Sequence, residues 1–206
     1  MLAADSEGRY SHTGILKKER GAWYVIHAVP GEPDFKGDAD RIKMEPVERF
    51  FDAGKAARGA VMHVQADSAL ACRAARSALG LFRKHLLFDH DYDLNDTTEM
   101  YCTELIDYVY RKEGIDLSEG RTTSVNIPGM SGDYLMPNDI AQSGRLCFDI
   151  LFLNTHYSLK QKRIEKVFYF TMMVMAVFVM AALLFFSKHS GRRVEKVQRV
   201  SAKRRL

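Results

Sequence analysis

An uncharged, apolar segment near the C-terminus constrains this chain more than any other feature. Residues 167–187 read VFYFTMMVMAVFVMAALLFFS and contain no Asp, Glu, Lys or Arg. A helix of this length rises about 30 Å, which is enough to cross the hydrocarbon core of a bilayer. The alternative is a helix buried in a protein core, but such helices normally keep a polar face. We therefore predict one C-terminal transmembrane helix.

The charge of the chain divides near the same point. From residue 160 onward there are 12 Lys or Arg and 2 acidic residues, whereas the preceding residues carry 18 basic and 24 acidic ones. The basic residues flank an apolar segment and have no interleaved aromatic residues, which argues against nucleic-acid binding and favours contact with a lipid bilayer. Eight of them follow the segment and four precede it. The positive-inside rule therefore predicts a single-pass membrane protein with a cytoplasmic tail and the domain on the opposite side.

The remaining pattern predicts one α+β domain over residues 1–150, a juxtamembrane linker over 151–166, the transmembrane helix over 167–187 and a basic tail over 188–206. Hydrophobic periodicity and turn residues define the elements within the domain. We expect strands at 12–16, 22–28 and 60–65, with a hairpin turn at 17–21, and a short strand and turn over 42–51. We expect helices at 67–87 and 103–112, a proline-led turn into a short helix at 136–141, and loops at 29–40, 89–96 and 120–133.

Three cysteines cannot complete a disulfide framework, and none has the CxxC spacing of a metal site. Cys72 lies in an alanine-rich helical stretch and Cys147 in an apolar run, so we expect both to be small buried side chains. Cys102 differs because it stands at the start of a predicted helix. A helix N-terminus and a nearby imidazole both lower a thiol pKa, so Cys102 is the candidate nucleophile.

Two histidines on the first predicted hairpin could serve this thiol. His12 is the candidate base, because the small residues Thr13 and Gly14 leave room for close approach. His27, on the next strand, could orient His12, since paired strands place such residues side by side on one face. The alternative is that all three residues are structural, because most helix cysteines are buried and inert, and the local pattern leaves both interpretations open.

The acidic run at residues 89–96 resembles the start of an EF-hand calcium loop. However, Leu94 stands where that loop needs glycine, and Met100 stands where it needs glutamate. We interpret the run as a turn-rich loop, and we expect neither a metal nor a cofactor.

Five short stretches occur in an order typical of one family. They are Tyr10-Ser11-His12-Thr13-Gly14-Ile15, Tyr24-Val25-Ile26-His27-Ala28, Asp91-Tyr92-Asp93, Tyr101-Cys102-Thr103-Glu104-Leu105 and Pro137-Asn138-Asp139-Ile140-Ala141-Gln142-Ser143. Together they resemble the permuted papain-like amidases of the YiiX/YaeF type, relatives of the NlpC cell-wall peptidases and of lecithin retinol acyltransferase. The resemblance covers about two-thirds of the chain, from residue 10 to residue 146.

This resemblance implies a circularly permuted papain-like (NlpC-like) fold with Cys102 as nucleophile and His12 as base. Many YiiX-type relatives carry glutamate at the third position, where this chain has His27 as in the acyltransferase branch. The family also opens with a strand and a helix that precede the histidine strand, and here only nine residues precede Tyr10. Residues 1–9 also lack the apolar core of a signal peptide, which conflicts with export of the domain. We expect either that the scaffold is shortened and lacks the N-terminal strand, or that the native chain starts upstream of Met1. The second alternative would explain both observations.

We therefore expect a membrane-anchored thiol amidase, peptidase or acyltransferase with a Cys-His-His site. Its substrate would be an amide or ester of a cell-envelope peptide or lipid, because the anchor holds the site near a membrane. Two alternatives remain open: an inactive binding module on the same scaffold, and a structural membrane adaptor.

Overall fold

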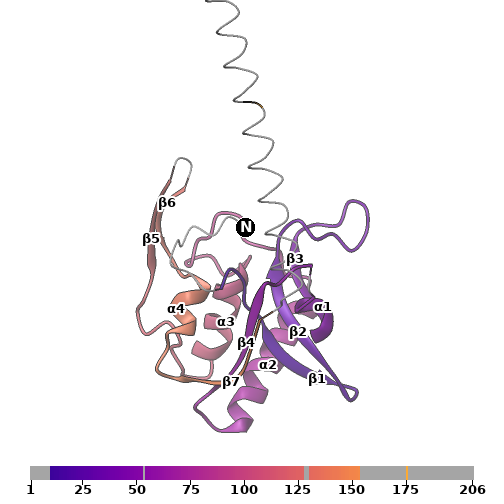
Figure 1. Ribbon diagram of the computed structural model, residues 1–206, viewed down its shortest axis with the longest axis vertical. Coiled ribbons are helices and arrows are strands. Elements are labelled where there is room, and N and C mark those ends of the chain that lie inside the picture. Colours follow the sequence, from indigo (N-terminus) through magenta and orange to yellow (C-terminus); the bar gives the residue numbers. More distant parts are fainter. Residues whose placement is uncertain (1–9, 53, 128–129, 154–174, 176–206) are drawn as a thin grey trace, which may run out of the picture. The chain divides into compact units, whose positions relative to one another are not determined.

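The computed structural model in Figure 1 describes residues 10–52, 54–127, 130–153 and 175. Residues 1–154 form one compact unit and residues 155–206 a second one, of which only Met175 is described. The predicted transmembrane segment lies outside the described residues apart from Met175. Among the residues that are described, no helix is both long and apolar enough to cross a membrane.

The N-terminal half is built on a three-stranded antiparallel sheet in the order β1-β2-β3 (Figure 1). Its strands are β1 (Ile15–Glu19), β2 (Ala22–Val29) and β3 (Arg41–Pro46). The predicted hairpin is confirmed, but its turn contains only Arg20 and Gly21, which have φ angles of 49° and 88°. Two residues with positive φ suit the right-handed twist of the flanking strands. The charged residues 17–19 therefore belong to the strand, not to the turn as predicted.

The rest of the unit alternates helices with two further strand pairs. The helices are α1 (Val47–Phe50), α2 (Ser68–Arg83), α3 (Cys102–Arg111) and α4 (Pro137–Ala141), and the strands are β4 (Arg58–Val64), β5 (Thr123–Ile127), β6 (Met130–Tyr134) and β7 (Leu146–Leu153). Strands β4 and β7 pair antiparallel with an irregularity at Val61/Met62, and β5 pairs antiparallel with β6. Mixed α and β structure was predicted. The predicted loop at 120–133 is wrong, because most of it forms the β5–β6 hairpin.

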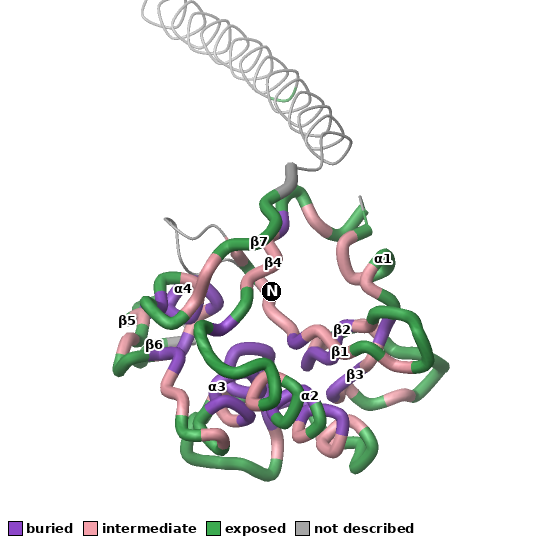
Figure 2. Tube along the Cα trace, turned by 90° about the horizontal axis from the view of Figure 1, so that it is seen from below, coloured by how far each residue is buried: buried purple, intermediate pink, exposed green. Residues whose placement is uncertain are grey.

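Helices α2 and α3 bury their apolar faces against β1–β3, which makes the core of the unit (Figure 2). On α3 the side chains of Cys102, Leu105, Ile106 and Val109 are buried. These positions share one face of a helix with a repeat of 3.6 residues. The core therefore surrounds the first turn of α3, where the candidate thiol lies.

The structure corrects the prediction for two cysteines. Cys72 is exposed, because it faces away from the buried α2 positions Ala74, Ala75 and Ala78. Cys147, on β7, is half-buried and accepts a hydrogen bond from Gln65 Nε2 at 3.0 Å. Only Cys102 is fully buried, with 1% of its surface exposed.

Candidate functional site

Hydrogen bonds of the preceding backbone N–H groups place Cys102 at the first position of α3. The preceding residue, Tyr101, is extended, and its N–H donates to the carboxyl group of Glu104 at 3.3 Å. One residue earlier, the Met100 N–H donates to the Leu87 carbonyl at 3.0 Å. The first N–H groups of a helix have no intrahelical acceptor. The Cys102 backbone N–H is therefore one of the donors at the site.

The thiol of Cys102 is surrounded by hydrogen-bond donors. It lies 3.6 Å from Thr103 Oγ1. Burial raises the pKa of Cys102 above its ordinary value, and hydrogen bonds from the Thr103 hydroxyl and from the backbone N–H groups of Thr13, Thr103 and Cys102 oppose that rise. The resting side chain is therefore a thiol. This differs from the expectation that the helix N-terminus and an imidazole lower its pKa, because desolvation is the largest influence on this thiol.

The bond from the Thr13 N–H is important because it joins the thiol to the residue next to His12. Residues 102 and 13 are far apart in the sequence, and this contact is made only in the folded chain.

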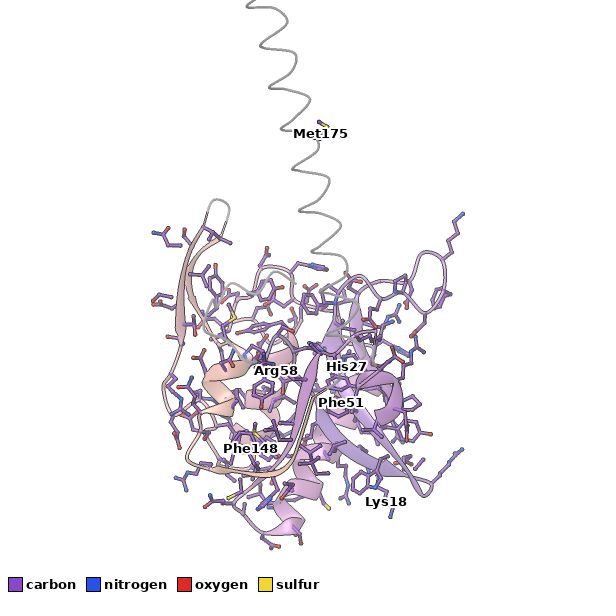
Figure 3. The ribbon with its side chains drawn as sticks, viewed as in Figure 1. Lys18, His27, Phe51, Arg58, Phe148 and Met175 are labelled. Carbon is purple, nitrogen blue, oxygen red and sulfur yellow. The ribbon has the colours of Figure 1, made fainter. Side chains whose placement is uncertain are left out.

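The two predicted histidines do lie together. His12 Nε2 and His27 Nδ1 are 2.8 Å apart, and the ring planes are inclined by 80°. His27 lies on β2 in the interior of the unit, with 2% of its surface exposed (Figure 3). Phe50 of α1 packs against both rings, at centroid distances of 5.6 Å and 5.1 Å. His12, by contrast, precedes β1, so its predicted strand position is wrong.

Both rings are held in the neutral form. Burial lowers the pKa of His12 to about 4; nearby Glu32 opposes this change and Lys55 adds to it. Burial also lowers the pKa of His27 far below its usual value, and His12, Lys55 and Lys43 lower it further. A neutral imidazole donates through one nitrogen and accepts through the other. The bond to His27 occupies Nε2 of His12 and leaves Nδ1 as the nitrogen that can take a proton from a thiol.

Gly14 makes the approach of the two histidine segments possible. A Cβ atom at this position would lie 2.4 Å from Val25 Cγ1, 3.0 Å from the Ile26 carbonyl oxygen and 3.1 Å from His27 Cβ. Real Cβ contacts are not this short, so only glycine fits without a shift of the backbone. The expectation that small residues after His12 allow close packing is consistent with this geometry.

A second contact anchors the His12 segment at its other end. Asn138 of α4 donates from Nδ2 to the Tyr10 carbonyl at 3.0 Å and accepts from the Tyr10 N–H at 3.2 Å. The Asn138 amide thus pairs with the backbone in the way a neighbouring strand does. Asn138 belongs to the fifth stretch that carried the family resemblance, but its anchoring role was not predicted.

Glu45 is a further site residue that the sequence analysis missed. Its Oε1 atom lies 3.3 Å from His27 Nε2, and both side chains are buried. On β3, Lys43 pairs with His27 and Glu45 lies two positions further along the same face. The charged residues that alternate with Ile42 and Met44 indicate a strand with one charged face. Only the register of β2 and β3 shows that this face lies beside His27.

The acidic run at 89–96 has a structural role. Asp89 is buried and accepts hydrogen bonds from the backbone N–H groups of Asp91, Tyr92 and Asp93. In the part of the chain that the structure describes, no group of three or more His, Cys, Asp or Glu side chains is placed to hold a metal ion.

Comparisons with known proteins leave the family of this chain open and show its fold. No family model matches the sequence, and no curated protein matches it. Among solved structures, the chain is similar to the crystal structure of the metalloprotein YiiX from Escherichia coli O157:H7. The TM-score is 0.54 at 17% sequence identity, and the match covers 70% of this chain and 84% of the YiiX chain. The expected YiiX-like fold is therefore confirmed, whereas the similarity does not extend to an activity.

Proposed function

We propose that this protein is a membrane-anchored cysteine hydrolase or acyltransferase of the permuted papain-like type. Cys102 is the nucleophile, His12 the base and His27 the residue that orients His12. The observation that carries the proposal is the pairing of His12 Nε2 with His27 Nδ1 at 2.8 Å, in a segment whose next residue hydrogen-bonds the Cys102 thiol. Nucleophilic catalysis by cysteine needs this combination of thiol, base and orienting group.

The chemistry begins from a neutral thiol and a neutral imidazole. Cys102 Sγ attacks the carbonyl carbon of an ester or amide while its proton passes to His12 Nδ1. The backbone N–H of Cys102 stabilises the oxyanion that forms. The tetrahedral intermediate collapses, the C–O or C–N bond breaks, and His12 returns the proton to the leaving group. Water then attacks the thioester in hydrolysis, whereas an amine or alcohol attacks it in acyl transfer. In either case His12 takes a proton from the acceptor, the C–S bond breaks, and the proton passes to the Cys102 sulfur.

Membrane anchoring belongs to the same proposal. It rests on the uncharged segment at 167–187 and on the basic residues that flank it. The anchor holds the domain near a bilayer, with the basic tail in the cytoplasm, so the substrates we propose are amides or esters of cell-envelope peptides or lipids. The description of YiiX as a metalloprotein is not carried over, because the residues described here form no group suited to a metal.

A second candidate function is an inactive binding module on the same scaffold. The burial of the Cys102 thiol and its raised pKa favour this candidate. A buried thiol with a high pKa is typical of a structural cysteine.

Acylation of Cys102 separates the two candidates. The full chain in detergent micelles, carrying Cys72→Ser and Cys147→Ser, would be mixed with p-nitrophenyl acetate and quenched in acid for mass spectrometry. The hydrolase or acyltransferase predicts a thioester on Cys102 that disappears in His12→Gln. The binding module predicts no thioester in either protein. Equal acylation with and without His12 would exclude His12 as the base.

A further inference from the structure

We propose that Glu45 is a positioning residue that sets the tautomers of both histidines. It keeps Nδ1 of His12 unprotonated, so that this nitrogen can accept a proton from the Cys102 thiol. This inference rests on the proposed function for its catalytic meaning. The arrangement of the protons themselves can be tested without any activity.

The contact that carries the inference is a buried nitrogen next to a carboxylate. His27 Nε2 is buried and has no hydrogen-bond partner among the residues that the structure describes. Glu45 Oε1 lies 3.3 Å from it, close enough for a hydrogen bond but without the geometry of one. A buried ring nitrogen without a partner costs free energy, and a small rotation of either side chain would complete this bond.

The other oxygen of Glu45 is held by cations. Arg49 Nε lies 3.1 Å and Lys55 Nζ 3.7 Å from Glu45 Oε2. Both cations pair with the negative charge of the Glu45 carboxylate. Lys55 also lies 2.7 Å from Glu32 Oε2, and Lys43 lies 3.1 Å from Asp34 Oδ1. The charged groups around the two histidines thus come from β3, α1 and the segments that follow β2 and α1.

The carboxylate determines where each proton lies. A carboxylate only accepts hydrogen bonds, so His27 must carry its proton on Nε2. Neutral His27 then has a lone pair on Nδ1, which accepts from Nε2–H of His12 across the 2.8 Å contact. Neutral His12 consequently has its lone pair on Nδ1. The opposite tautomer of His27 would place two lone pairs, those of Nε2 and Glu45 Oε1, against each other.

The same chain stabilises the charged form of His12 when the thiol gives up its proton. His12 becomes an imidazolium, still donating from Nε2 to His27, while the negative charge of Glu45 lies beyond His27. No proton needs to move between the two rings. The carboxylate therefore acts through His27, much as a carboxylate orients a single histidine in other nucleophilic sites.

The test measures the tautomers directly. Two-bond ¹H–¹⁵N spectra of the full chain in detergent micelles at pH 7, with ¹⁵N-labelled histidine, distinguish Nε2–H from Nδ1–H rings. His12→Gln and His27→Gln assign the signals. The variants are Glu45→Ala and Glu45→Gln, and the matched control is Glu48→Gln, an exposed carboxylate three residues away. Acylation of Cys102 by p-nitrophenyl acetate is measured on the same proteins in the Cys72→Ser, Cys147→Ser background.

We expect Nε2–H tautomers for both rings in the parent protein and in Glu48→Gln. Glu45→Ala should shift His27 toward the Nδ1–H form, and both Glu45 variants should slow acylation by about tenfold or more. An Nδ1–H form of His27 in the parent protein overturns the inference, even if no variant folds. Tautomers that stay unchanged in Glu45→Ala overturn it as well. If the tautomers behave as expected but Cys102 is never acylated, the positioning role stands and the proposed function fails.

Discussion

The ionisable side chains at the site are buried, and the pH dependence of stability should report this burial. The pKa of His27 is lowered far below the 6.5 of an ordinary histidine, and that of His12 is lowered to about 4. The unfolded chain binds protons on both rings as the pH falls below about 6.5, and the folded chain does not. The stabilisation from neutral histidines is therefore present above pH 6.5 and is lost toward pH 4.

Replacement of His27 isolates this contribution. Between pH 7 and pH 4.5 we expect the parent protein to lose about 2 kcal/mol more free energy of unfolding than His27→Gln loses. Urea titrations of both proteins at the two pH values give the difference. His85→Gln is the control, because that histidine is exposed. Equal losses in the parent protein and in His27→Gln would contradict the burial of a neutral ring.

Glu104 has the opposite effect on the pH dependence of stability. Burial raises the pKa of this carboxyl group to about 8, against the hydrogen bond from the Tyr101 N–H, and nearby Asp89 raises it further. The folded chain keeps the proton that the unfolded chain releases above about pH 4.5, so this stabilisation is lost as the pH rises toward 8. The amide of Glu104→Gln stays neutral.

Glu104→Gln should therefore gain stability relative to the parent protein as the pH rises. We expect the difference in free energy of unfolding to change by roughly 2 kcal/mol in favour of the variant between pH 5 and pH 8. Thermal or urea unfolding at both pH values measures it. Glu113→Gln, at a carboxyl group two residues beyond the end of α3, serves as a comparison. A difference independent of pH would show that Glu104 is ionised throughout.

At the scale of the elements, a single glycine allows the His12 segment to pack against β2. We expect Gly14→Ala to destabilise the protein by about 2 kcal/mol and to separate His12 from His27, because the new methyl group would overlap Val25 and His27. Gly80→Ala, in α2, is the matched control. A Cβ there meets nothing within 4 Å, so this variant should gain about 0.5–1 kcal/mol. Urea titration compares the free energies of unfolding of the two variants with that of the parent protein. An unchanged free energy in Gly14→Ala would contradict the close approach of the His12 segment to β2.

The other end of the segment depends on α4. Asn138→Ala removes both hydrogen bonds to Tyr10 and should cost roughly 2 kcal/mol, since each is worth about 1 kcal/mol. Hydrogen exchange of the Tyr10 amide should accelerate at the same time. Asn126→Ala, at an exposed position on β5, is the comparison and should leave that amide protected. Unchanged exchange in Asn138→Ala would show that α4 does not hold this segment.

At the scale of the whole molecule, the chain should divide into a folded domain and an anchor. Residues 1–154 form a compact unit. We expect a fragment of these residues to unfold cooperatively in urea and to remain in the supernatant after alkaline carbonate treatment of membranes. The full chain, with the uncharged segment at 167–187, should remain in the pellet. Release of the full chain by carbonate would contradict a membrane-spanning anchor.

Some elements could be predicted from the sequence because their signals are local. The 3.6-residue repeat located α2 and α3, and the aromatic and β-branched residues located β2. The β5–β6 hairpin was missed because the segment is rich in Gly, Ser and Thr, and its alternation of polar and apolar residues spans only Ser124 to Ile127. The strand β7 was missed because its apolar run, interrupted only by Asp149, lacks a period of two. In α2, the 3.6-residue repeat that marks the buried face also places Cys72 on the opposite, exposed face. Cys72 was nevertheless predicted to be buried, because the residues around it are rich in alanine.

By itself, the sequence determined which chemical groups are present and roughly where β2, α2 and α3 lie. Cys102 at a helix start and His27 within the first hairpin follow from local pattern, whereas His12 lies before β1 and not on it as predicted. Only the tertiary structure decided that the two histidine rings pair, that Glu45 lies beside His27, and that the Cys102 thiol is buried. The reason is physical: pairing needs distances set by strand register, and a pKa depends on desolvation by residues that are distant in the sequence.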